Sequence, residues 1–264
     1  MTISDWIHES EIRGTTSFSA DEVKSAFSGR AWNGIKVELS RLAAKGRIQA
    51  VHRGFYVIVP VQYQLKGVIP PSYYLDDLMR SIKKPYYVGL LSAAALHGAS
   101  HQRSMQMQVV TLDPRIRESR KDGGLNWIYR RVLPEAFIME KNAEVGILRY
   151  SGPELTAVDL VQFANHAGGY QRVATVLEEL VDSLDVEKIS ELVQFTTVAT
   201  LQRLGYLLEF VLDRRELADK VFAVLKGLPY RNSILLSNGH ARRQSAPANR
   251  WRVNGNIDIE LDDL

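Results

Sequence analysis

The hydrophobic and polar pattern of the first 45 positions predicts three helices. We expect them over residues 4–13, 19–27 and 34–45: the first would bury Trp6 and Ile7, the second begins at a helix-start signal, and the third places apolar side chains three or four positions apart. In the third segment, one stripe carries the apolar residues that must face a core, namely Ile35, Leu39 and Leu42. The opposite side of this segment is basic and carries no acid at its centre.

The ends of these segments carry residues that are typical of helix termini. Ser19 and Glu22 have the spacing of a capping box, in which each side chain accepts a hydrogen bond from the backbone amide of the other residue. Asn33 is the expected cap of the third helix, and Gly46 is the residue type favoured just past a helix end.

Two short apolar runs follow the third helix. Residues 48–51 and 55–59 are joined by His52, Arg53 and Gly54, so they predict a β-hairpin with a cationic tip. Glycine at the tip allows a tight turn and a close approach of the backbone to a ligand.

The order of three helices and a hairpin predicts a winged helix-turn-helix domain over residues 1–60. A linker is expected over residues 61–71, which end in Ile-Pro-Pro, and a larger mixed α/β domain over residues 72–264. The predicted fold class is α+β. In the larger domain we expect helices over 73–82 and 86–98, strands over 105–112, 125–132 and 144–151, five helices between 153 and 227, and short strands over 233–237, 249–253 and 257–261.

Composition and charge distribution narrow the functional classes. The chain has no cysteine, which excludes disulfides, thiolate metal sites and thiol nucleophiles. Its most apolar window, residues 88–99, is too short to cross a bilayer, and the N-terminal residues do not have the pattern of a signal peptide, so we expect a cytoplasmic protein with no membrane partner. The net charge is +3, but seven lysine or arginine residues lie between positions 21 and 53, against three acidic residues.

This basic segment predicts a site for double-stranded DNA. In a winged helix-turn-helix the third helix enters the major groove, and the hairpin tip lies on the phosphate backbone. The predicted contact residues are Asn33, Lys36, Val37, Ser40, Arg41, Lys45, Arg47, His52 and Arg53. An alternative is that the basic helix and hairpin are only the solvated face of a small domain.

Other residue clusters have compositions that recur in metal or catalytic sites. His97 and His101 have the spacing of a metal pair but lack an evident third ligand. The acidic sets are the alternating Asp258, Glu260 and Asp262, the pair Glu154 and Asp159, and the cluster Asp185, Glu187 and Lys188. Because no phosphate-binding loop or nucleophile arrangement accompanies them, we expect no catalytic residue, no metal and no cofactor.

Two further clusters have structural interpretations. Arg242 and Arg243 form a second basic spot, which we expect to be an exposed loop, with an extended DNA footprint or a surface for an acidic partner as alternatives. A group of tyrosines near the expected domain junction is predicted to pack in the core, and its members are Tyr73, Tyr74, Tyr86 and Tyr87.

Five stretches in order along the chain resemble the AbiEi-type antitoxins of AbiE toxin–antitoxin systems. They are "IQAVHRGFYVI", "YYVGLLSAAALHGASHQ", "GILRYSGPELTAVDLV", "ATLQRLGYLLE" and "RWRVNGNIDIELDDL". The resemblance implies an N-terminal domain that binds inverted repeats upstream of its own operon and represses it, and a C-terminal domain that counteracts a nucleotidyltransferase-like toxin. It also implies that the DNA contacts are Lys36, Arg41, Lys45, Arg47 and Arg53.

Two other classes of protein remain open from the sequence. One is a metal-dependent nuclease or nucleotidyltransferase that the winged helix targets to DNA, with Asp258 and Glu260 as metal ligands. The other is a protein-interaction module whose winged helix binds a partner chain.

Overall fold

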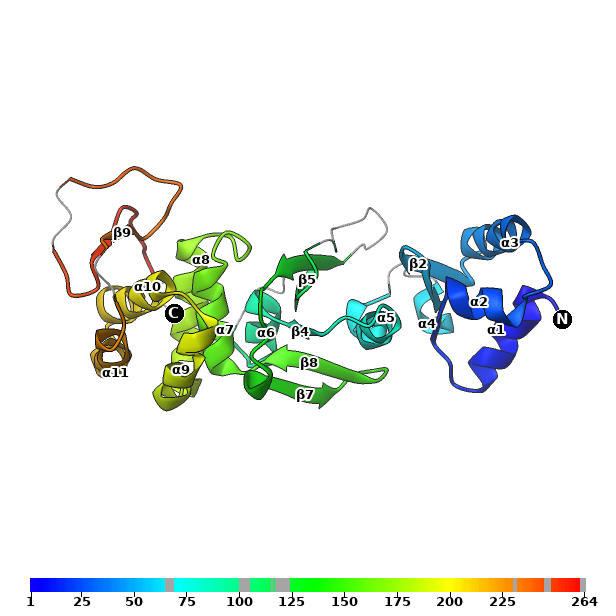
Figure 1. Ribbon diagram of the computed structural model, residues 1–264, viewed down its shortest axis with the longest axis horizontal. Coiled ribbons are helices and arrows are strands. Elements are labelled where there is room, and N and C mark those ends of the chain that lie inside the picture. Colours follow the sequence, from blue (N-terminus) through cyan, green and yellow to red (C-terminus); the bar gives the residue numbers. More distant parts are fainter. Residues whose placement is uncertain are drawn as a thin grey trace. The chain divides into compact units, whose positions relative to one another are not determined.

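The chain is a mixed α+β protein in a computed structural model that describes residues 1–64, 69–99, 105–114, 116, 124–229, 232–244 and 248–261 (Figure 1). Its internal contacts divide it into two compact units. Unit 1 contains Met1–Tyr86, Met105–Tyr129 and Glu140–Arg149, and unit 2 contains Tyr87–Ser104, Arg130–Met139 and Tyr150–Leu264. The sequence-based division into residues 1–60, a linker and residues 72–264 stays a prediction.

Unit 1 begins with six elements that we call the head. They are α1 (Ile3–Ile12), β1 (Ser17–Ser19), α2 (Ala20–Ala26), α3 (Trp32–Ala44), β2 (Ile48–His52) and β3 (Phe55–Ile58). The three expected helices and the hairpin are present, and β1 is an addition that its three-residue length hid from the pattern. The sheet has the order β1-β3-β2 and is antiparallel, so β3 lies between the other two strands.

A single apolar cluster holds the head together. It is made of Ile3, Ile7, Phe18, Val23, Phe27, Ile35, Leu39, Ile48 and Ile58, which are all buried. Leu42 packs at its edge, so the stripe predicted for the third helix is confirmed. Phe18 in β1 contacts Trp6 edge-on, with 5.3 Å between ring centroids, and stacks on Tyr56 of β3.

The helix termini of the head agree with the sequence at α2 and differ at α3. Ser19 and Glu22 form the predicted capping box. The cap predicted at Asn33 is wrong, because α3 begins at Trp32 and the backbone of Ala31 takes the capping position. The carbonyl of Ala31, in extended conformation, accepts from the amides of Gly34 and Ile35, so no polar cap side chain is used.

The chain after the head adds a five-stranded sheet with the order β6-β5-β4-β8-β7. The elements are α4 (Val61–Gln64), η1 (Pro71–Tyr73), α5 (Leu75–Ser81), β4 (Tyr86–Val88), α6 (Leu90–Leu96), β5 (Met107–Thr111), β6 (Leu125–Tyr129), η2 (Glu135–Phe137), β7 (Ile138–Asn142) and β8 (Ile147–Ser151). Strands β5 and β6 pair in parallel, as do β4 and β8. The strands expected over 105–112, 125–132 and 144–151 are confirmed as β5, β6 and β8.

Three parts of this region differ from the expectation. The helix predicted over 86–98 starts with the buried strand β4, whose aromatic and β-branched residues suit a sheet, and Gly89 separates this strand from α6. Strand β7 lies at an edge of the sheet and was not predicted. Its residues are largely exposed, so apolar and polar residues do not alternate along it. The expected linker contains the short helix α4. Tyr73, Tyr74, Tyr86 and Tyr87 are buried, as predicted.

Unit 2 is mainly helical after β8. Its elements are α7 (Pro153–Gln162), α8 (Tyr170–Leu180), η3 (Val181–Ser183), α9 (Val186–Glu191), η4 (Leu192–Phe195), α10 (Val198–Phe210), α11 (Arg215–Lys226), β9 (Ile234–Leu235) and β10 (Val253–Asn254). Helix α7 is buried from Glu154 to Val161, because it packs against α6, α8, α9 and α10. None of the described helices has the length and apolar character needed to span a bilayer.

The strand expected over 257–261 is wrong in the described part of this segment. The backbone of Glu260 is bonded on both sides by the side chain of Gln171, which accepts from the amide at 3.2 Å and donates to the carbonyl. A side chain therefore satisfies the backbone groups that a neighbouring strand would have satisfied.

Helix α10 has a notch at Gly205 that the ring of Trp251 fills. Trp251 is fully buried, its indole nitrogen donates to Glu209 at 2.6 Å, and Gln202 donates to its carbonyl at 2.7 Å. A Cβ on residue 205 would lie 2.0 Å from this ring. Only glycine fits at this position.

We therefore expect Gly205→Ala to lower the free energy of unfolding by roughly 3 kcal/mol, because the added methyl group forces the buried ring to move. Gly34→Ala is the matched control, since Gly34 is also helical and nothing lies within 4 Å of its added Cβ. This control should raise stability by about 0.5 kcal/mol through helix propensity. Urea unfolding followed by circular dichroism measures both. Equal stability of Gly205→Ala and the unaltered chain would contradict this packing.

Candidate nucleic-acid interface

Helix α3 has a buried face and an exposed face. Ile35 and Leu39 are 1% exposed and hold the helix on the core of the head. On the other side lie Lys36, Val37, Ser40 and Arg41, which are all exposed and which we call the basic face. Asn33 at the first turn and Lys45 at the end of the helix are exposed as well.

The cations of the basic face and Lys45 have no acidic partner within the described residues. Lys36, Arg41 and Lys45 take part in no ion pair there, so their charge is directed to solvent. Val37 is half exposed, which is unusual for a large apolar side chain. An exposed methyl group between cations is the combination that can contact a thymine methyl group beside phosphates.

The only acidic residue of α3, Glu38, is engaged away from the basic face. Glu38 accepts from the amide of Ile3 at 3.0 Å and pairs with Arg30 at 2.7 Å. The carboxylate of Glu38 therefore interacts favourably with the N-terminal turn of α1 and with the charge of Arg30. It does not neutralise the cations of the basic face.

The hairpin tip presents a second cation. Arg53 is exposed and has no carboxylate partner in the part of the chain that the structure describes. Gly54 has a φ of +74°, and its carbonyl accepts from the amide of Ala20 at 2.7 Å, which fixes the tip on the start of α2. The strand register shifts between Ala50 and His52, and His52 is half-buried beside the tip.

Arg47 differs from the other predicted contacts. Its guanidinium pairs with Glu11 of α1 at 3.1 Å, and both side chains are about one-third exposed. Sequence reasoning missed this pair, because Glu11 is 36 positions away and α1 carries no pattern that points to it. The residues Asn33, Lys36, Val37, Ser40, Arg41 and Lys45 come together on one helix, and His52 and Arg53 lie on the hairpin.

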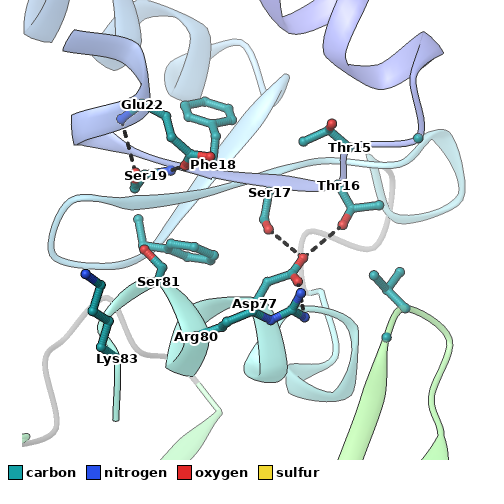
Figure 2. Close-up of a pocket in the computed structure, with 14 residues that line it drawn as sticks. Thr15, Thr16, Ser17, Phe18, Ser19, Glu22, Asp77, Arg80, Ser81 and Lys83 are labelled. Atoms are coloured by element: carbon teal, nitrogen blue, oxygen red, sulfur yellow. Dashed lines mark hydrogen bonds and ion pairs between the residues drawn. The ribbon is translucent and has the colours of Figure 1, made fainter. Parts of the chain in front are cut away.

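A cleft of about 630 Å³ lies beside β1, within unit 1 (Figure 2). Asp77 of α5 points into it, accepts from Ser17 at 2.8 Å and from Thr16 at 3.4 Å, and receives a hydrogen bond from Arg80 at 3.0 Å. The carboxylate of Asp77 is thus already paired with the guanidinium of Arg80. These contacts fix β1 of the head on α5.

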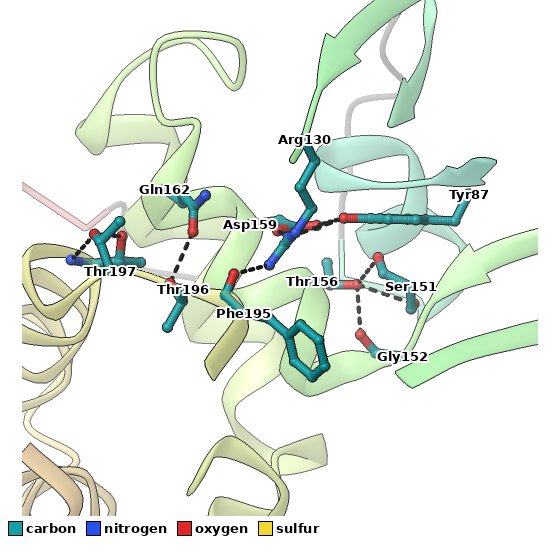
Figure 3. A network of polar contacts seen from close by, with 11 residues as sticks. Tyr87, Arg130, Ser151, Gly152, Thr156, Asp159, Gln162, Phe195, Thr196 and Thr197 are labelled. Atoms are coloured by element: carbon teal, nitrogen blue, oxygen red, sulfur yellow. Dashed lines mark hydrogen bonds and ion pairs between the residues drawn. The ribbon is translucent and has the colours of Figure 1, made fainter. Parts of the chain in front are cut away.

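Asp159 of α7 belongs to the core of unit 2 (Figure 3). Asp159 is fully buried and forms an ion pair with Arg130. Tyr87 donates to Asp159 at 2.6 Å and accepts from Arg130 at 3.1 Å, and Arg130 also donates to the carbonyl of Phe195 at 2.6 Å. Burial raises the pKa of Tyr87 well above its usual value, so the phenol stays a donor.

The other acidic candidates have structural partners too. Glu154 is buried and accepts from the amide of Asp185, which caps α9, at 3.0 Å, and it lies 4.0 Å from Lys188. Asp258 pairs with Arg243, and this hydrogen-bonded pair lowers the pKa of Asp258. Glu187 is exposed at the first turn of α9.

The histidine candidates are not brought together as a site. His97 contacts the carbonyl of Ser151 through Nε2 at 2.8 Å, and His101 lies outside the described residues, as does Asp262. Across the described ranges, no three histidine or acidic side chains are placed to hold a metal ion.

Comparison with known proteins finds a family similarity in the middle part of the chain. The family model for the AbiEi antitoxin C-terminal domain matches residues 87–210. These residues are therefore similar to the C-terminal domain of AbiEi antitoxins. The match confirms the resemblance to AbiEi-type antitoxins predicted from the sequence, and it supports an antitoxin role. No curated protein matches the chain.

A solved structure extends the similarity over nearly the whole chain. The crystal structure of the RV2827C protein from Mycobacterium tuberculosis is similar with a TM-score of 0.66 and 16% sequence identity. The similarity covers 95% of this chain and 89% of that chain. At this identity it supports the α+β fold alone.

The buried pair of Arg130 and Asp159 gives a stability prediction. Asp159→Ala should lower the free energy of unfolding by about 3–5 kcal/mol, because it leaves the guanidinium of Arg130 buried without its counter-charge. Asp258→Ala also removes one carboxylate from an arginine pair, but this pair is exposed, so stability should change little. Thermal unfolding of the two variants compares them. A similar loss in both would show that the Arg130 pair is not a core element.

Proposed function

We propose that the protein is an antitoxin that also represses its own operon, and that the head is a winged helix-turn-helix domain that binds inverted repeats in promoter DNA. The order of α1, β1, α2, α3, β2 and β3, with β3 central in an antiparallel sheet, is consistent with a winged helix. The observation that carries the proposal is the exposure of Lys36, Arg41 and Arg53 without acidic partners among the described residues.

In this proposal α3 lies in the major groove. Asn33, Lys36, Ser40 and Arg41 face base edges, and Val37 contacts a thymine methyl group. Arg53 at the hairpin tip contacts phosphate, with His52 beside it, and Lys45 contacts phosphate at the end of α3. Arg47 has a smaller part, since DNA phosphate has to compete with Glu11 for its guanidinium.

The antitoxin role rests on the family match over residues 87–210. The resemblance to AbiEi-type antitoxins implies that the toxin is nucleotidyltransferase-like, and we propose that the C-terminal region counteracts it in the cytoplasm. The acidic residues considered as catalytic candidates make structural contacts instead. Asp159 and Glu154 are buried and bonded to other residues of the fold, and Asp258 is paired with Arg243. These contacts favour a binding protein over a nuclease or nucleotidyltransferase.

DNA binding is tested by titrating the protein on its own upstream region at several salt concentrations. Arg53→Ala should weaken binding to all sequences alike and reduce the salt slope by about one, because one phosphate contact is lost. Lys36→Ala and Arg41→Ala should relax base preference at particular positions, at a cost of about 1–3 kcal/mol each. Arg47→Ala should have a smaller effect than Arg53→Ala.

The control for this titration is Arg215→Ala, which removes the same charge from an exposed position on α11 beside Asp213. It should leave affinity and salt slope unchanged. Affinity that does not depend on salt, or an equal loss in Arg215→Ala and Arg53→Ala, would contradict a specific role for the head.

The two proposed activities should separate in one variant. The triple substitution Lys36→Ala, Arg41→Ala and Arg53→Ala removes exposed side chains only, so the fold should persist while operator binding is lost. Co-expressed with the cognate toxin, this variant should still restore growth, whereas a reporter fused to the promoter should be derepressed. Loss of growth rescue, with the protein folded and at normal abundance, would mean that neutralisation depends on the basic face.

A further inference from the structure

The turn between α2 and α3 carries a cation that the proposed function does not use (Figure 1). Arg30 lies in this turn, just before Trp32, the first residue of α3. Its amide donates to the carbonyl of Phe27 at 2.9 Å, and its side chain is 42% exposed. The turn is therefore closed by a backbone hydrogen bond, and it presents a guanidinium beside the first turn of the helix that we assign to DNA.

Two contacts confine the guanidinium of Arg30. It donates to Oε2 of Glu38 at 2.7 Å, and it lies over the ring of Phe27, 5.6 Å from the ring centroid. Phe27 belongs to the core of the head, so its ring is a fixed support. Within the described residues, Glu38 is the single hydrogen-bond acceptor of this side chain. Because a guanidinium carries several N–H donors, it can still donate to an anion from outside the head.

Glu38 is itself held from a second side. Its Oε1 accepts from the amide of Ile3 at 3.0 Å, and Ile3 is fully buried at the start of α1. A capping box of Thr2 and Asp5 fixes this start. Both oxygens of the Glu38 carboxylate are thus engaged, one by α1 and the other by Arg30.

Position 38 lies beside the basic face. With about 100° between successive residues of a helix, Glu38 falls between the buried Ile35 and the exposed Arg41. The side chain of Glu38 is 27% exposed, which agrees with this position. Its carboxylate is close enough in sequence to pair with Arg41, three positions on, but it pairs with Arg30. This choice of partner leaves Arg41 unneutralised within the described residues and holds Arg30 next to the basic face.

We propose that Arg30 is a phosphate contact of the head and that Glu38 is its positioning residue. This inference rests on the proposed binding of DNA by α3, and it adds a cation at the opposite end of α3 from Lys45. When a helix enters the major groove with its first turns at the base edges, the residues just before it lie near the phosphates that border the groove. A guanidinium that is already confined loses less freedom on binding than a mobile side chain.

Charge and position predict opposite effects of Glu38. By charge alone, a carboxylate on a helix that contacts DNA weakens binding to phosphates, so its removal should strengthen binding to any duplex. As a positioning residue, Glu38 holds Arg30 in place, so its removal should weaken binding to the operator. The sign of the change in operator affinity separates the two roles.

The test is a fluorescence anisotropy titration of the full chain on its own upstream region at several salt concentrations. Arg30→Gln should weaken binding by roughly ten-fold and reduce the salt slope by about one, the effect of one lost charge-assisted contact to phosphate. Arg13→Gln is the matched control, because it removes an exposed arginine of the same head whose hydrogen bond goes to the hydroxyl of Ser10 at 3.4 Å. This control should change affinity less than two-fold.

The positioning role is tested by Glu38→Gln, which keeps one side-chain oxygen for the amide of Ile3, and circular dichroism checks its fold. It should weaken operator binding by roughly five-fold, and it should not weaken binding further in the Arg30→Gln background, because the two residues act as one unit. Stronger operator binding by Glu38→Gln, or additive losses in the double variant, would overturn the positioning role.

Arg30→Lys is a second test that leaves α3 unaltered. It keeps the charge but not the planar guanidinium that Glu38 and Phe27 confine, so it should weaken operator binding by at least three-fold. Unchanged affinity of this variant would also overturn the positioning role.

Failure of this inference differs from failure of the proposed function. If the unaltered chain binds its upstream region with the expected dependence on salt and on Arg53, but Arg30→Gln behaves like Arg13→Gln, only the contact at Arg30 is overturned. If the unaltered chain binds no DNA, both are overturned.

Discussion

The packing of Ile35 and Leu39 into the core of the head is the contact on which the proposed interface depends. Because these two side chains are almost completely buried, the rotation of α3 about its axis is fixed, and Lys36, Val37, Ser40 and Arg41 must face outward. The acids that could neutralise this face are held elsewhere: Glu38 bonds to Ile3 and Arg30, and Glu11 pairs with Arg47. The core and the ion pairs together leave an exposed, positively charged helix face.

The head could be predicted from the sequence in most of its parts because its signals are local. Helical spacing places the stripe of α3, and a capping box three residues apart starts α2. The features that were missed depend on partners far along the chain. Strand β1 is defined by its pairing with β3, and the engagement of Arg47 is defined by Glu11.

Unit 2 illustrates the same limit for its polar residues. Asp159 and Glu154 are carboxylates, a residue type common in catalytic sites. Their burial in the structure identifies them as structural residues. Asp159 meets Arg130 and Tyr87 from distant segments, so no spacing in the sequence indicates the contact. One edge strand of the sheet was also difficult: nearly all residues of β7 are exposed, so it lacks the alternating pattern that predicts a strand.

The notch at Gly205 has a consequence for the order in which the chain matures during synthesis. The core of the head is complete once Ile58 has left the ribosome, whereas α10 emerges some forty residues before Trp251, the ring that fills its notch. When α10 has been synthesised, the notch at Gly205 is therefore still unfilled. By then all the residues of the head core have been made. The head, which we propose binds DNA, can therefore fold first. The packing of α10 in the C-terminal region can be completed only after Trp251 has been synthesised.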